Sequence, residues 1–161
     1  MVFYLVGLGL GDEKVSFSVL LFLLLLRPCT SHPPLPGSGA DISALCAPCQ
    51  DITVRGLEKV RGCSKIFLEH YTSVLGVDKA RLEAFYEKEV ILADRFLCES
   101  SAEDIYACAA VDDVALLVVG DPLCATTHTD MMLRARAAGC RVEVVHNASV
   151  MGAIASCGLQ L

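Results

Sequence analysis

The feature that most constrains the fold is a short apolar run that ends abruptly in a turn. The run covers Val114 to Val119 and is followed at once by Gly120-Asp121-Pro122. A continuous run of mainly branched residues of this length predicts a strand buried on both faces, as in a parallel sheet. Apolar residues then recur at helical spacing from Met131 to Ala138. Strand, polar loop and helix in this order are typical of α/β folds, which bind ligands at the carboxyl ends of strands.

The same alternation extends along most of the chain. Besides the central run, strands are predicted at the start of residues 1–12 and at 65–69, 89–92 and 141–145. Three helices are predicted over 78–86, over 102–110 (capped by Ser101) and over 150–156. Two further helices are predicted to end near Arg61 and before Gly139. Val54, Leu57 and Val60 are expected to face the core. We therefore predict an α/β fold with a doubly wound, mainly parallel five-stranded sheet.

Three loops at the ends of predicted strands are candidates for a binding site. They are the glycine loop around Gly7, Gly9 and Gly11, the loop from Asp121 to Thr127, and the loop from His146 to Ser149. Parallel strands bring such loops to one edge of the sheet, where Asp121 could accept hydrogen bonds from a ligand. The alternative is purely structural, with Gly120-Asp121-Pro122 as a turn and a threonine as helix cap. The spacing G-x-G-x-G matches neither the dinucleotide fingerprint nor a P-loop.

Composition limits the partners and the compartment. A chain of 161 residues with a formal net charge of −6 fits one domain and makes nucleic acid an unexpected partner. Nine cysteines, an odd number, are scattered along the chain, and several lie inside predicted helices or strands. This indicates free thiols in a reducing compartment, so we expect a cytoplasmic location. Cys46 and Cys49 form a lone C-x-x-C without a second pair, so no metal site is expected.

Residues 15–50 do not fit the α/β pattern. Val15 to Leu26 is almost entirely apolar, and five of the six prolines follow within this stretch. Twelve apolar residues are too few to cross a bilayer, which takes about 20, and the preceding Asp12-Glu13-Lys14 is unlike the positive start of a signal peptide. We expect no membrane partner and three parts: 1–14 with the first strand, 15–50 as an unrelated, looped-out insert, and 51–161 as the rest of the domain. The two ends of residues 15–50 can be encoded by codons that resemble splice-donor and splice-acceptor sequences. This suggests the hypothesis that the segment is a translated intron or a gene-model error.

Six segments together resemble the diphthine synthases, methyltransferases with the tetrapyrrole-methylase fold. They occur in the family's order: Tyr4–Asp12, Asp51–Leu57, Leu68–Leu75, Val118–Pro122, Ala125–His128 and Val145–Ser149. The resemblance implies S-adenosylmethionine as methyl donor and a modified histidine of elongation factor 2 as acceptor, methylated on its amino group and, in eukaryotes, on a carboxylate. It also implies that full-length members form homodimers. The family's donor contacts fall on these residues: Leu10, Asp121, Cys124, Ser149 and Val150.

The chain departs from the family pattern in three ways. Cys124 stands where the family usually has glycine, residues 15–50 interrupt the pattern, and the family's second domain is missing. We therefore expect the truncated chain to be inactive alone, and a non-catalytic isoform or fragment is the main alternative. A tetrapyrrole methyltransferase acting on a porphyrin or corrin precursor is a further alternative. A nicotinamide enzyme is disfavoured, because the glycine spacing is wrong and no acidic residue closes the second strand in the expected context, Glu69 being the only candidate for a ribose-binding acid.

Overall fold

The computed structural model describes residues 1–9, 51–72, 79–124, 126–153, 155 and 158. Five parallel strands form one sheet in the order β3-β2-β4-β1-β5. The strands are β1 (Val2–Gly7), β2 (Lys65–Glu69), β3 (Val90–Ala93), β4 (Val114–Val118) and β5 (Arg141–Val145). The predicted α/β class and the five-stranded parallel sheet are confirmed.

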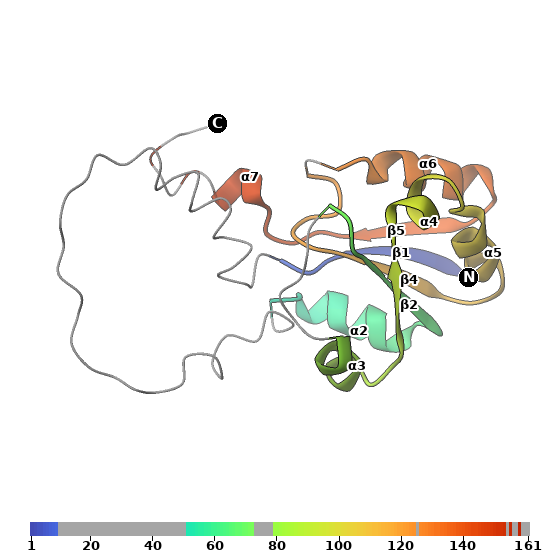
Figure 1. Ribbon diagram of the computed structural model, residues 1–161, viewed down its shortest axis with the longest axis horizontal. Helices are drawn as coiled ribbons and strands as arrows, with labels where there is room; N and C mark the ends of the chain where they lie inside the picture. The colour runs from blue at the N-terminus through green and yellow to red at the C-terminus, as the bar shows by residue number, and fades with distance from the viewer. Residues whose placement is uncertain (10–50, 73–78, 125, 154, 156–157, 159–161) are drawn as a thin grey trace.

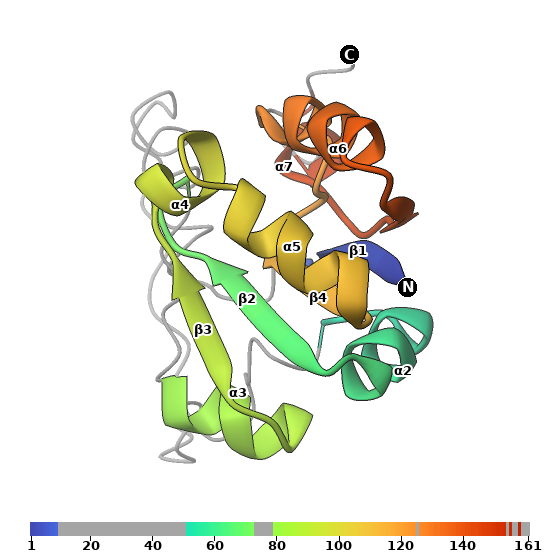
Figure 2. The same ribbon diagram turned by 90° about the vertical axis from the view of Figure 1, so that its right-hand side faces the viewer.

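Helices cover both faces of this sheet, so the fold is doubly wound (Figures 1 and 2). On one face lie α2 (Val54–Gly62) and α3 (Lys79–Tyr86). On the other lie α4 (Arg95–Glu99), α5 (Glu103–Val111) and α6 (His128–Ala137). The short α7 (Val150–Ala153) follows β5 beyond the carboxyl end of the sheet (Figure 1). None of the helices in the described ranges has the length and apolar character that a membrane span requires.

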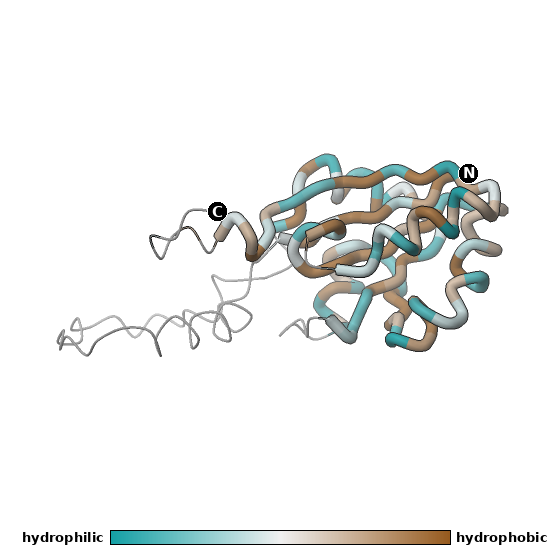
Figure 3. The backbone as a smooth tube through the Cα atoms, turned by 90° about the horizontal axis from the view of Figure 1, so that it is seen from above, coloured by the Kyte–Doolittle hydropathy of each residue, from teal (hydrophilic) through white to brown (hydrophobic). Residues whose placement is uncertain are grey.

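The two-sided cover explains the unbroken apolar run of β4. Val114, Leu116 and Val118 point to the α5/α6 face, whereas Ala115 and Leu117 point to the α2/α3 face. All five side chains are fully buried. Burying a valine or leucine side chain contributes about 1.5–3 kcal/mol, so β4 is a main source of stability. The apolar stretches of the tube in Figure 3 follow the central strands accordingly.

Some local predictions were wrong at helix ends. Helix α4 was not predicted; it begins after Asp94, whose Oδ1 accepts a hydrogen bond from Leu97 N at 2.8 Å. Ser101 does not cap α5, because the chain is already helical at Ala102, the N-cap residue, which makes no side-chain bond. Val54, expected to face the core, is 76% exposed.

The orientation of α2 follows from its own cap. Thr53 Oγ1 accepts a hydrogen bond from Gly56 N at 3.0 Å, which fixes the first turn. Gly56 and Val60 are buried, four residues apart on one face, and that spacing turns Val54 outward. A side chain at Gly56 would lie 3.1 Å from Val6 Cγ1, so the glycine lets α2 approach β1 closely.

Leu10 and the insert predicted at 15–50 lie outside the described residues, but the residues flanking them are neighbours. A Cβ added to Gly9 would lie 3.1 Å from both Cβ and O of Asp51. Asn147 Nδ2 also donates to O of Gly7 at 3.0 Å and to O of Asp51 at 2.9 Å. The end of β1 and the start of α2 therefore meet in space, and we propose that residues 15–50 are an insertion between them.

Deletion of Val15–Gln50 tests this proposal. Leu10 to Lys14 would remain to join Gly9 to Asp51, a span that five residues easily cover. We expect unchanged helix and strand content, and higher solubility because an apolar block is removed. Circular dichroism reports the helix and strand content, a thermal melt reports the unfolding transition, and the protein concentration left in solution after centrifugation reports the solubility. Loss of the cooperative transition in the shortened chain would show that the segment is part of the domain.

Candidate active site

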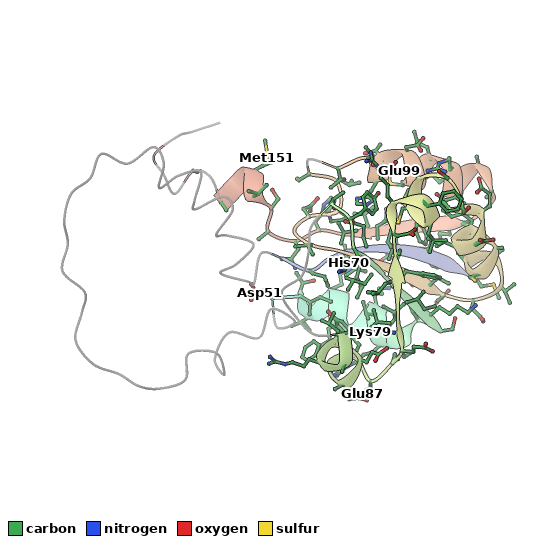
Figure 4. The ribbon with its side chains drawn as sticks, viewed as in Figure 1. Asp51, His70, Lys79, Glu87, Glu99 and Met151 are labelled. Atoms are coloured by element: carbon green, nitrogen blue, oxygen red, sulfur yellow. The ribbon has the colours of Figure 1, made fainter. Side chains whose placement is uncertain are left out.

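The loops after β1, β4 and β5 meet at the carboxyl edge of the sheet. Gly9 and Gly120 exchange backbone hydrogen bonds, Gly120 N to Gly9 O at 2.9 Å and Gly9 N to Gly120 O at 3.2 Å. Leu8 N donates to Val118 O at 2.8 Å, continuing the β1–β4 pairing into the loops. Figure 4 shows Asp51 beside the end of β1 and Met151 on α7 after β5. The sequence correctly placed these three loops together.

This edge is a topological switch point. The connection from β1 leaves through α2 on one face, and the connection from β4 leaves through α6 on the other. Because β1 and β4 are adjacent in the sheet, their loops separate to opposite faces. Open α/β sheets bind ligands at such a point.

Gly7 allows the three loops to approach one another. A Cβ on Gly7 would lie 2.6 Å from Gly120 O, 2.9 Å from Asn147 Cβ and 3.0 Å from Pro122 Cδ. Real Cβ atoms do not approach backbone oxygen this closely, so no side chain fits at this position. The backbone conformation adds a second constraint, because Gly9 and Gly120 have φ of 76° and 79°.

Asn147 connects all three loops through its amide group and backbone. Its Nδ2 donates to the carbonyls of Gly7 and Asp51, and its Oδ1 accepts from Ala148 N at 2.7 Å. Its backbone N–H donates to Asp121 Oδ2 at 3.2 Å. A side chain with two donors and one acceptor is needed here, which is the chemistry of an amide.

Asp121 is the second connecting residue, and it is buried at 6% exposure. Its Oδ1 accepts from Leu123 N at 2.9 Å, and its Oδ2 accepts from His146 Nδ1 at 2.8 Å as well as from Asn147 N. Burial alone would raise the pKa of Asp121, but these hydrogen bonds together lower it. The carboxylate is therefore ionised at neutral pH and holds the β4 loop against the β5 loop.

His128 and His146 both make hydrogen bonds to these loops. His128 is fully buried at the start of α6, and its Nδ1 lies 3.2 Å from Pro122 O. A carbonyl oxygen can only accept, so Nδ1 carries the proton. Burial lowers the pKa of His128, with partial compensation from Glu69, so the ring is neutral. Thr126 Oγ1 donates to the same carbonyl at 2.8 Å, whereas the side chain of Thr127, the N-cap residue of α6, makes no capping hydrogen bond.

The predicted donor contacts divide between two of the loops. Asp121 and Cys124 follow β4, where Cys124 is half-buried and its backbone N–H donates to Asp121 O at 3.3 Å. Ser149 and Val150 follow β5, both half-buried, with Ser149 Oγ accepting from Met151 N at 3.2 Å. Leu10 is outside the described residues. Donor binding by these residues stays a prediction.

The sequence analysis did not predict the pocket that lies at this edge. A pocket of about 520 Å³ is lined by Tyr71, Thr72, Arg95, Glu99, Thr126 and Thr127. These residues lie in the segments that follow β2, β3 and β4 along the chain. The segment Leu68–Leu75 entered the sequence analysis only through the family resemblance, and α4 is five residues long, too short to give a periodic signal.

Glu69, the candidate ribose-binding acid, has a structural role instead. Although almost fully buried, its carboxylate accepts from Tyr71 N at 2.7 Å, Thr72 N at 2.6 Å and the Thr72 hydroxyl. These bonds shape the loop after β2. Over the described ranges, no cluster of His, Cys, Asp or Glu could hold a metal ion.

A family model of the tetrapyrrole (corrin/porphyrin) methylases matches residues 46–160. The chain belongs to this methylase family. A diphthine methyl ester synthase of Candida glabrata is 62% identical over 112 residues, which are 69% of this chain and 38% of that protein. Its counterpart in Schizosaccharomyces pombe is 46% identical over 160 residues, 99% of this chain and 44% of that protein.

A crystal structure of a diphthine synthase shares this methylase fold. It superposes with a TM-score of 0.72 at 28% identity, covering 97% of this chain and 48% of the solved one. The resemblance to diphthine synthases is thereby confirmed. The methylase chain spans less than half the length of the curated relatives reported above.

Substitution at Gly7 tests the approach of the three loops in this methylase chain. Gly7→Ala forces the new methyl group onto Gly120 O and should cost at least about 2 kcal/mol of unfolding free energy. Gly62→Ala is the matched control, because nothing lies within 4 Å of the added Cβ. The control should be neutral or stabilising by up to about 1 kcal/mol. Urea denaturation measures both, and equal stability of the two variants would contradict the packing described.

The lowered pKa of Asp121 predicts a pH-dependent contribution to stability. Its contribution is complete well above the ordinary value of 3.8 and is lost as pH falls through the lower folded value. Asp121→Asn should therefore destabilise by about 1–2 kcal/mol at pH 7, and by less as the solution is acidified below the ordinary pKa. Urea denaturation across this pH range gives the difference. Asp104→Asn, at an exposed position of α5, should leave the pH dependence unchanged.

Proposed function

We propose that this chain is part of an S-adenosylmethionine-dependent methyltransferase of diphthamide biosynthesis. The acceptor is a modified histidine of elongation factor 2, and the enzyme works in the cytoplasm. The names of the relatives support the reaction class, and full-length members are proposed to form homodimers. The observation that carries the proposal is the joining of the β1, β4 and β5 loops at the switch point by Asn147 and Asp121.

The loops offer groups that suit S-adenosylmethionine. The Gly120 backbone has no side chain to block a close approach, and Ser149 supplies a hydroxyl. Cys124 and Val150 add small half-buried side chains on the segments that follow β4 and β5. The donor supplies an electrophilic methyl group on a sulfonium, and we propose that Leu10, Asp121, Cys124, Ser149 and Val150 hold it.

This chemistry needs alignment more than a strong acid or base. The acceptor's lone pair forms the bond to the methyl carbon as the carbon–sulfur bond breaks, and that electron pair stays on sulfur. The chain's part is to hold the two reactants in line. Asp121 acts on position, because its oxygens bind the loops and the ionised carboxylate cannot donate a proton.

Two alternative functions compete with this proposal. A porphyrin or corrin substrate is less favoured, because relatives up to 62% identical carry the diphthine methyl ester synthase name. A non-catalytic fragment is the other alternative, since the chain spans less than half of its relatives. We propose that this chain alone does not turn over, because the second domain supplies the other wall of the cleft.

Calorimetric titration of S-adenosylmethionine tests the donor site directly. We expect binding by the chain without Val15–Gln50, and tighter binding by Cys124→Gly in that background, by at least about threefold, because the side chain no longer fills the approach. Cys108→Ala, on the distant α5, is the matched control and should bind like the parent.

The outcomes of this titration are separable. One outcome is that the chain binds the donor but does not methylate elongation factor 2, and that methylation appears when the second domain is supplied. This outcome supports a half-site in a methyltransferase. Absence of donor binding in every variant, and still in a chain with the second domain restored, would overturn the proposed function.

A further inference from the structure

The pocket between α4 and the loops after β2 and β4 contains a pair of opposite charges. Arg95 Nε lies 2.9 Å from Glu99 Oε2, and the two side chains are 74% and 36% exposed. An exposed pair one helical turn apart contributes little to stability, so solvent or a ligand can compete for either partner. Arginine has five N–H donors, and in the described part of the chain Glu99 is the partner that engages its side chain. The guanidinium therefore retains donors for a further anion.

The backbone that carries this pair is held from both ends. The Asp94 side chain caps α4 at Leu97 N, and Arg134 of α6 donates to the carbonyls of Cys98 and Glu99, both at 3.2 Å. Glu99 lies on α4 at the carboxyl end of β3 (Figures 2 and 4). The charged pair is thus presented from a fixed support, as expected of a preformed ligand site.

The opposite wall is fixed as well. The buried Glu69 carboxylate accepts from the backbone of Tyr71 and Thr72, which shapes the loop after β2. Thr126 is tied to Pro122 O through its hydroxyl at 2.8 Å. Since Thr126 belongs to the same loop as Asp121 and Cys124, the pocket adjoins the proposed donor loops, but none of the predicted donor contacts is among its lining residues.

We propose that this pocket binds the amino-acid-like end of the methyl acceptor. Arg95 receives the carboxylate through its fork of donors, and Glu99 receives the ammonium group. The inference rests on the proposed function, in which the acceptor carries both groups. The relatives' name, methyl ester synthase, itself requires a carboxylate as the group to be methylated. Thr126 and Thr127 of the pocket belong to the loop that carries Asp121 and Cys124, so a carboxylate held in the pocket would lie next to a proposed donor loop.

Nuclear magnetic resonance of the 15N-labelled chain tests the binding chemistry. The probes are L-2-aminobutyrate, which carries both charges, and butyrate and butylamine, which carry one each. We expect L-2-aminobutyrate to shift the amide resonances of Tyr71, Thr72 and Thr127 at lower concentration than either single-charge probe. Arg95→Gln should weaken its binding by about tenfold, and Arg95→Lys should recover part of this loss.

Lys79→Gln is the matched control, because Lys79 forms the same kind of helical ion pair with Glu83 on the opposite face of the sheet. It should leave the affinity unchanged within about twofold. Absence of shifts at the three pocket amides, or equal affinity of Arg95→Gln and the parent, would overturn the inference.

The donor titration separates this inference from the proposed function. Donor binding without aminobutyrate binding rejects the acceptor pocket and leaves the methyltransferase proposal standing. Aminobutyrate binding in a chain that fails to bind the donor, even with its second domain, supports the pocket chemistry and rejects the methyltransferase.

Discussion

The arrangement of the candidate site depends on one contact, the approach of the Gly7 backbone to the loops after β4 and β5. The 2.6 Å between Gly120 O and a hypothetical Cβ on Gly7 shows how little space there is. Because these loops are so close, the Asn147 side-chain amide donates hydrogen bonds to the carbonyls of both Gly7 and Asp51. The Asp121 carboxylate accepts a further hydrogen bond from the backbone N–H of Asn147. The binding edge is therefore built from backbone and short polar side chains, which suits a reaction governed by alignment.

The sheet makes this contact possible because β1 and β4 are fixed from both faces. Their side chains alternate between two separate apolar clusters, one under α2 and α3 and the other under α5 and α6. A one-residue slip of β1 against β4 would send every buried side chain to the wrong face. Since the register is so strongly specified, the loops at the strand ends inherit positions that they could not hold by themselves.

Much of the fold could be predicted because its signals are strong and local. The run from Val114 to Val119 has the composition of a two-sided buried strand, and the repeated alternation of strands and helices gave the parallel sheet. The glycine, Asp121 and Asn147 loops could be expected at one edge, because parallel strands end together. The sequence did not show that Asp121 and Asn147 bond each other's loops, since that depends on strand order, which jumps from β1 to β2 across β4.

The errors also have physical causes. A five-residue helix such as α4 is too short to show a hydrophobic periodicity. The sequence therefore did not identify Arg95 and Glu99 as pocket residues. Ser101 resembled a cap by residue type, but the chain is already helical at Ala102. Val54 was assigned to the core by hydrophobicity, whereas the Thr53 cap set the phase of α2 and left it exposed.

Because Gly9 lies against Asp51, the length of the chain between them has little effect on the stability of the sheet. Both flanks are held by Asn147, so whatever joins them must only close a loop between two adjacent points. The entropy of closure grows with the logarithm of loop length, and going from five residues to the 41 of positions 10–50 costs about 2 kcal/mol. Proteins with this fold can therefore gain or lose residues between Gly9 and Asp51 at a small cost in stability. The geometry of the neighbouring strands stays the same.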